Sequence, residues 1–139
     1  MKNLVIDTGL VEYRLNDAVS IYINPTDSTF AQKLFDTFDE FDKKQEEYQH
    51  RITAETDNRL IWQLSRDLDK EMRDKINSLF GADIVTPLIG DMNIYALAEG
   101  MPIWANIIMA IVDEMSESVV EEKKKSSARV KAYTKKYHK

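Results

Sequence analysis

Glu47 and His50 are the first residues whose types and spacing could do chemistry. In a helix they stand about one turn apart, and a Glu-x-x-His pair of this kind supplies part of the ligand set of a di-iron four-helix bundle. Such a bundle needs the pair twice, and the sequence holds it once, among lysine and glutamine residues. We therefore expect no metal site here and interpret both side chains as part of a solvated helix face.

Four carboxylates upstream of this pair resemble a cation cluster by composition alone. They are Asp36, Asp39, Glu40 and Asp42. A calcium loop needs oxygen ligands at alternate positions around a central glycine, and this segment contains no glycine. The spacing instead places the carboxylates on the polar side of a helix.

Catalysis by other side chains has equally little support. The chain has no cysteine and two histidines, which removes thiolate chemistry and leaves little for imidazole. The turns at Gly81 and Gly90 lack the glycine spacing and the lysine of a phosphate-binding loop, and the serines between residues 116 and 127 lack a nucleophile elbow. We predict no catalytic, cofactor-binding or metal-binding residues and expect a protein that is not an enzyme.

The composition is that of one globular domain. Its 139 residues are 43% hydrophobic and 31% charged, with 4 glycines and 3 prolines, which favours helix over disorder. The longest apolar stretch, residues 101–112, is too short to span a membrane, and residues 1–7 are too short and polar for a signal peptide. We expect a protein made in the cytosol, without export and without a membrane partner.

Charge is distributed unevenly along the chain. Residues 123–139 hold eight of the 19 basic residues and no acid, which leaves 11 basic against 24 acidic residues before them, a net charge of −13. The sequence therefore predicts a single acidic domain over residues 1–122 and a basic tail over residues 123–139. We expect the tail to be solvated and partly frayed, or to lie on the acidic domain. The candidate partner-binding residues are Lys123, Lys124, Lys125, Arg129, Lys131, Lys135 and Lys136.

A β-hairpin is predicted over residues 10–23. Two runs rich in β-branched and aromatic residues alternate there in part, with the turn formers Asn16 and Asp17 between them. Pro25 then ends the second strand because it cannot donate a ladder hydrogen bond, and Thr26 or Asp27 can cap a following helix.

Two long helices are predicted next, joined at Thr56-Asp57. Each carries one apolar stripe with helical spacing. The first stripe is Phe30, Leu34, Phe38, Phe41, Tyr48 and Ile52, and the second is Leu60, Leu64, Leu68, Met72, Ile76 and Leu79. Because neither helix can bury its stripe alone, we expect a long αα-hairpin.

The remaining residues predict an irregular segment and a buried C-terminal helix. Gly81 is a candidate C-terminal cap, and glycines and Pro87 break the following stretch, in which Leu97 and its apolar neighbours should point inwards. Pro102 suits the first position of a helix whose apolar stripe contains Trp104, which we place in the interior. The fold class is α+β, mostly α-helical.

Several short motifs together resemble the tail assembly chaperones of long-tailed bacteriophages and prophages. They are Ile23-Asn24-Pro25-Thr26-Asp27-Ser28-x-Phe30, Ile76-Asn77-x-Leu79-Phe80-Gly81-x-Asp83, Gly90-Asp91-x-Asn93 and Ala98-x-Gly100-x-Pro102-x-Trp104-x-Asn106. The order of the predicted elements also fits this family. The similarity covers residues 23–114.

The resemblance implies a non-enzymatic helper in the host cytoplasm that is absent from the finished virion. Such a chaperone coats the tape measure protein and brings tail tube subunits to it, and many also exist as a longer, frameshifted product. Self-association is left open. The alternatives are a small phage regulatory or nucleic-acid-associated protein that acts through the basic tail, and a structural component of the tail itself; nucleic acid is the less favoured partner because the domain is acidic.

Overall fold

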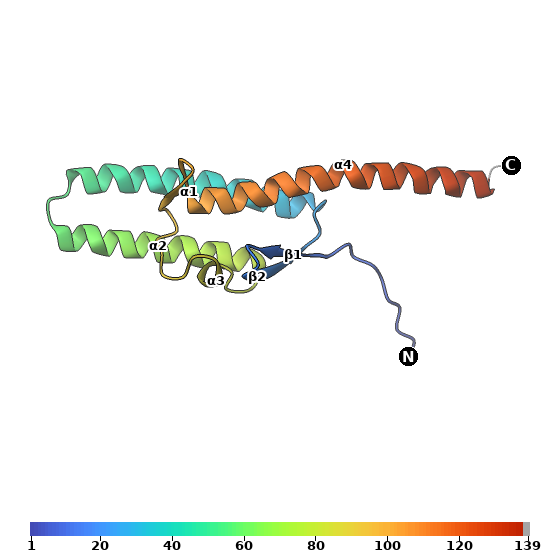
Figure 1. The fold of residues 1–139 in the computed structure, drawn as a ribbon, viewed down its shortest axis with the longest axis horizontal. Helices are drawn as coiled ribbons and strands as arrows, with labels where there is room; N and C mark the ends of the chain where they lie inside the picture. The colour runs from blue at the N-terminus through green and yellow to red at the C-terminus, as the bar shows by residue number, and fades with distance from the viewer. Residues whose placement is uncertain (138–139) are drawn as a thin grey trace.

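The computed structural model describes residues 1–137 (Figure 1). Strands β1 (Val11–Leu15) and β2 (Val19–Ile23) precede helices α1 (Ser28–Ala54) and α2 (Asn58–Phe80). Helix α3 (Val85–Ile89) and the short strands β3 (Leu97–Ala98) and β4 (Met101–Pro102) lead to α4 (Ile103–Tyr137). The expected α+β, mostly helical fold is confirmed, with its N-terminal β-hairpin, its pair of long helices and its C-terminal helix.

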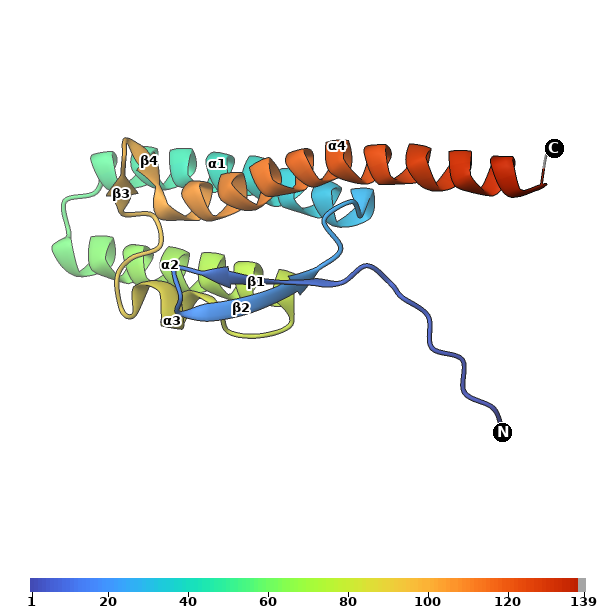
Figure 2. The same cartoon turned by 45° about the vertical axis from the view of Figure 1, so that its right-hand side comes forward.

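The β-hairpin follows from its turn residues. β1 and β2 pair antiparallel, with Val11 opposite Ile23. Asn16 and Asp17 have φ angles of 52° and 54°, the left-handed conformation of a type I′ turn, whose twist matches that of the strands. Ile21 and Ile23 are buried, and the hairpin lies beside the C-terminal half of α2 (Figure 2).

Local signals set the ends of α1 and α2. The carboxylate of Asp27 accepts a hydrogen bond from the Thr29 amide at 3.0 Å, and that of Asp57 accepts one from the Arg59 amide at 3.0 Å. Each carboxylate satisfies an amide that the first helical turn leaves unpaired. α2 ends at Gly81, whose φ of 68° lies in the left-handed region. These helix ends match the sequence predictions.

The core lies between α1, α2 and the first half of α4. α4 runs antiparallel beside α1, while α2, the β-hairpin and α3 lie below them in Figures 1 and 2. Leu34 of α1, Met72 and Ile76 of α2, and Ile108 of α4 are buried in this core. Trp104 is 2% exposed, which confirms its predicted interior position.

The segment between α2 and α4 is hydrogen-bonded to α2 and to the first turn of α4. The Asp69 carboxylate accepts a hydrogen bond from the Ile94 amide at 2.7 Å, and the Ile94 carbonyl accepts one from the Trp104 amide at 3.0 Å. The prediction that Leu97 points inwards is wrong, because β3 and β4 form a surface ribbon on which Leu97 is 70% exposed. Pro102 belongs to this ribbon, and α4 begins directly after it.

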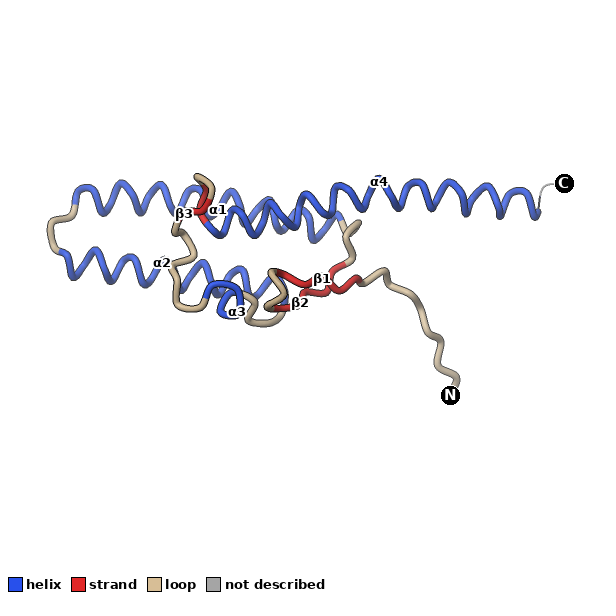
Figure 3. The backbone as a smooth tube through the Cα atoms, in the orientation of Figure 1, coloured by secondary structure: helices blue, strands red, loops and turns tan. Residues whose placement is uncertain are grey.

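α4 continues past the body of the protein. Its buried residues end at Met115, whereas residues 121–132 and 134–136 are exposed. In Figures 1 and 3 this second half projects well beyond the start of α1. We call residues 121–137 the α4 extension.

Candidate partner-binding surface

The α4 extension is held by an aromatic anchor in the first half of its helix. The Trp104 ring packs edge-on against Phe38 and Phe41 of α1, with ring centroids 5.2 Å and 5.4 Å away. The indole Nε1 also donates a hydrogen bond to Oε1 of Gln45 at 2.7 Å. Because these contacts fix α4 against α1, the direction in which the α4 extension leaves the body is set by the core.

A shallow apolar groove lies where α4 leaves α1. It has a volume of about 180 Å³ and includes Ala31 and Phe35 of α1 and Val112, Met115 and Val119 of α4. Phe35 is 49% exposed, so part of an aromatic ring faces solvent beside the root of the α4 extension. This groove and the α4 extension form one continuous accessible surface.

The seven candidate cations predicted from the sequence all lie on the α4 extension. Successive residues of a helix are rotated by about 100°, so the cations fall into rows along it. One row holds Lys124, Lys131 and Lys135, a second holds Lys125, Arg129 and Lys136, and Lys123 lies apart from both. The small residues Ala128 and Ala132 separate the two rows. The result is an exposed basic helix face with two rows of positive charge.

The sequence leaves open whether the basic tail is solvated or lies on the acidic body, and in the structure it is solvated. Residues 123–136 are helical and continue α4 without a break, so the charge is carried away from α1 and α2. Lys125 Nζ lies 3.7 Å from the Glu122 carboxylate one turn earlier in the same helix. Because the helix is continuous, the basic residues project from the body along the axis of α4. Lys139 lies outside the described residues.

Ion pairs on the body join its own elements. Lys44 of α1 pairs with Glu71 of α2, and this carboxylate raises the pKa of the Lys44 ammonium group. The guanidinium of Arg73 lies 2.9 Å from the Asp69 carboxylate and donates a hydrogen bond to the Gly90 carbonyl at 2.8 Å. These pairs position α1, α2 and the segment after α3, and they leave most of the acidic side chains of α1 on the surface.

The tyrosines Tyr48 and Tyr95 form a second polar junction between elements. Their hydroxyl groups lie 3.4 Å apart, and the Tyr95 hydroxyl donates to the Ser65 carbonyl at 3.2 Å. Burial, together with the hydrogen bond to Tyr95, raises the pKa of the Tyr48 hydroxyl. The junction ties α1 and α2 to the segment before β3, so we assign it a structural role.

The side chains whose spacing resembles a metal-ligand set are separated or solvated. His50 is 81% exposed, and its Nε2 lies 3.9 Å from Glu46 rather than beside Glu47. Asp36 accepts a hydrogen bond from Gln32, and Glu40 lies 3.8 Å from the Lys44 ammonium group. Within residues 1–137, no three His, Asp or Glu side chains gather as a metal-ligand set would.

No helix in the described part of the chain is long and apolar enough to cross a membrane.

Two exposed apolar features are missing from the sequence predictions. Trp62, near the start of α2, is 64% exposed because it lies off the buried stripe of that helix. Leu4, Val5 and Ile6 form an apolar run that no described element covers. The run is visible in the sequence. Its exposure depends on whether distant elements fold over it, and a local sequence pattern does not predict their position.

Comparison of the chain with protein-family models, with curated proteins and with solved structures gives no match. The assignment of a function therefore depends on the resemblance of its motifs and on the surface described here.

Proposed function

We propose that this chain is a tail assembly chaperone of a long-tailed phage or prophage. It binds the tape measure protein without catalysing a reaction, and it helps to recruit tail tube subunits during tail assembly. It acts in the host cytoplasm and is not retained in the finished virion. The observation that carries the proposal is the α4 extension, a basic helix that projects from an acidic body.

The α4 extension suits contact with another helix. A tape measure protein of the kind the resemblance implies is long, largely helical and prone to aggregate. An exposed helix can lie along such a chain, with small residues allowing close approach and two rows of cations meeting carboxylates on either side. The groove at Ala31 and Phe35 adds an apolar binding site next to the start of the α4 extension.

The charge of the acidic body would keep a complex with the partner in solution, which a chaperone also requires. Residues 1–122 carry a net charge of −13, and charge of one sign keeps complexes apart in solution. The α4 extension would bind the aggregation-prone partner, while the acidic bodies of neighbouring complexes would repel one another. Such a chain can cover its partner without joining complexes together. This division of roles explains why opposite charges are segregated along the chain.

Co-expression with a phage tape measure protein from the same genome tests the proposal. The wild-type chain should keep the tape measure protein in the soluble fraction. Charge reversal of one row, Lys124→Glu with Lys131→Glu and Lys135→Glu, should return it to the pellet.

A matched variant controls for the change in net charge. Lys43, Arg51 and Lys75 are exposed on the body, so the triple change to glutamate alters the charge equally and should leave the tape measure protein soluble. If the tape measure protein precipitates to the same extent with and without the wild-type chain, the proposal fails.

A second candidate function is binding to nucleic acid through the same helix. The observation that favours it is the separation of the basic residues from the acidic body, which weakens the repulsion of phosphate. Removal of the residues after Glu122 would then abolish binding to a DNA duplex, and the affinity of the intact chain would fall steeply with salt. A chaperone predicts little duplex binding at physiological salt.

A further inference from the structure

The N-terminal arm, which we define as residues 1–10, is an extended segment that leaves the body (Figure 2). Leu4, Val5 and Ile6 are 81%, 92% and 76% exposed. Three consecutive large apolar side chains in solvent are unfavourable, and an extended segment of this kind is ready to pair with another chain. The arm therefore needs a covering surface that its own body does not supply.

The root of the arm is fixed in direction. The Thr8 carbonyl accepts a hydrogen bond from Asn24 Nδ2 at 2.9 Å, and the Gly9 amide donates to the Asp7 carboxylate at 2.9 Å. Gly9 has a φ of 72°, and a Cβ at this position would lie 2.7 Å from Asn24 Nδ2. Because the turn is built into the contact with β2, the arm points away from its own molecule.

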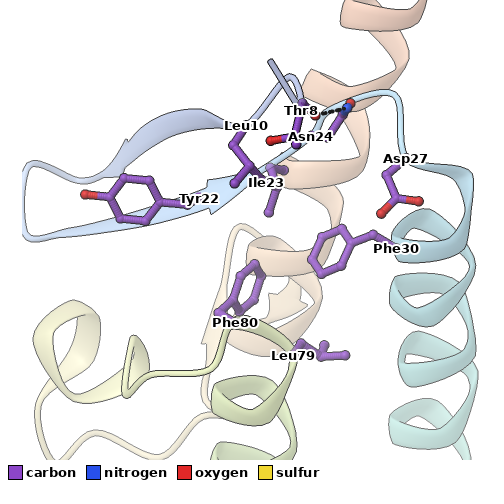
Figure 4. Close-up of a pocket in the computed structure, with 9 residues that line it drawn as sticks. All are labelled: Thr8, Leu10, Tyr22, Ile23, Asn24, Asp27, Phe30, Leu79 and Phe80. Carbon is purple, nitrogen blue, oxygen red and sulfur yellow. Dashed lines mark hydrogen bonds between the residues drawn. The ribbon is translucent and has the colours of Figure 1, made fainter. Parts of the chain in front are cut away.

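A groove of about 520 Å³ opens at this root (Figure 4). Its apolar lining comes from the arm root, β2, α1 and α2, namely Leu10, Ile23, Phe30, Leu79 and Phe80. The rings of Phe30 and Phe80 meet edge to face with centroids 5.6 Å apart. Among the residues that line it, Asp27 alone is charged.

We propose that this groove receives Leu4, Val5 and Ile6 of a second copy of this chain, in a reciprocal exchange of arms. The arm is apolar at these three positions, with Lys2 two residues before them and Asp7 directly after them, and the groove is mostly apolar with the Asp27 carboxylate among its lining residues. Apolar surfaces therefore meet when the arm enters, and Lys2 at its far end is the side chain that can pair with the Asp27 carboxylate of the other copy.

The geometry favours a symmetric pair. Arm and groove lie at the same end of the molecule, so one twofold axis can place each arm in the other copy's groove and leave neither exposed. From Leu10 to Val5 an extended chain spans about 17 Å, at about 3.3 Å per residue, which reaches across to an adjacent groove. An arm turned away at Gly9 cannot fill its own groove without breaking the Asn24 hydrogen bond.

Cross-linking tests the exchange directly because the wild-type chain has no cysteine. Val5→Cys and Leu79→Cys are made as separate variants, mixed, and oxidised mildly. The mixture should give disulfide-linked heterodimers that join residue 5 of one copy to residue 79 of another. A mixture of Val5→Cys with Val130→Cys is the control, since Val130 is exposed on the α4 extension, and should give little of this product.

The oligomeric state gives a second measurement. In sedimentation equilibrium the wild-type chain should have twice its monomer mass of 16.1 kDa. Val5→Asp should give the monomer mass while keeping the helical circular dichroism spectrum of the wild type, and Val130→Asp should remain dimeric. A wild-type monomer throughout the concentration range overturns the proposal. So does a mixture of Val5→Cys and Leu79→Cys that gives no more heterodimer than the Val130→Cys control, or an oligomer that survives Val5→Asp.

Discussion

The indole Nε1 of Trp104 donates a hydrogen bond to the side-chain oxygen of Gln45, 2.7 Å away. The bond joins α4 to α1 across 59 positions of sequence, beside the buried rings of the aromatic anchor. Together with the ring contacts of Trp104, it holds the start of α4 against α1 and so helps to set the side of the molecule on which the rows of cations lie.

Removal of this acceptor should destabilise the fold. In Gln45→Ala the buried indole N–H loses its partner, and an unsatisfied buried donor costs about 1–3 kcal/mol. Chemical denaturation measures the free energy of unfolding. Gln49→Ala, at an exposed position one turn later on α1, provides the control for helix propensity. Equal effects of the two substitutions would show that the Trp104 bond contributes nothing.

The two tryptophans should respond very differently to truncation. Trp104→Ala removes a ring that is 2% exposed, and loss of a buried aromatic residue lowers the free energy of unfolding by about 3–5 kcal/mol. Trp62→Ala removes a ring that is 64% exposed, and a surface change of this kind stays within about 0.5 kcal/mol. A large loss of stability in Trp62→Ala would mean that this ring is buried in solution, against the structure.

Much of the local fold is predictable because its signals lie within a few residues. Asn16 and Asp17 tolerate the left-handed turn, Asp27 and Asp57 accept hydrogen bonds from first-turn amides, and Gly81 adopts a left-handed cap. None of these depends on a distant partner. The apolar stripes are predictable from their spacing through most of their length, with Leu34, Met72 and Ile76 buried. Leu60, at the start of the second stripe, is 36% exposed, so the prediction is wrong there.

The errors concern residues whose environment is set by distant parts of the chain. Leu97 is apolar, yet it is exposed because the β3–β4 ribbon turns it outwards. The run of lysines predicts a solvated, partly frayed tail; these residues are exposed, and α4 continues through them because its anchored first half already supplies a helix to extend. Sequence predicts which residues form the candidate surface, but not the direction in which α4 carries them.

Asp83 should make the stability depend on pH in the acid range. The Thr86 amide donates a hydrogen bond to its carboxylate at 3.1 Å, and with further bonds from the Thr86 hydroxyl and Asn77 this holds the pKa of Asp83 below its ordinary value of 3.8. Because the pKa is lower in the folded state, the ionised group stabilises the fold above pH 3.8 and loses this effect as the pH falls through its folded pKa.

Asp83→Asn isolates this contribution. The difference in free energy of unfolding between the wild type and the variant should be constant near neutral pH and should shrink towards acid, as measured by urea denaturation at a series of pH values. A difference that does not change with pH would mean that the hydrogen bonds to Asp83 do not favour its charged form.

The α4 extension should be much less stable than the body when the protein is alone. A single exposed helix has no tertiary contacts to hold it, and isolated helices of about 12–15 residues are marginal in water. In amide hydrogen exchange, residues 121–132 should therefore exchange with little protection, while residues 104–115 should exchange only with global unfolding. Strong protection of residues 121–132 in the free protein would mean that another surface already covers them.

The same exchange measurement, repeated on the complex with the tape measure protein, tests most directly whether the α4 extension is the docking surface. The amides of residues 121–132 should become protected on binding, and the charge-reversed row of Lys124, Lys131 and Lys135 should abolish that protection. If the complex forms while residues 121–132 exchange as fast as in the free protein, the α4 extension is not where the partner binds.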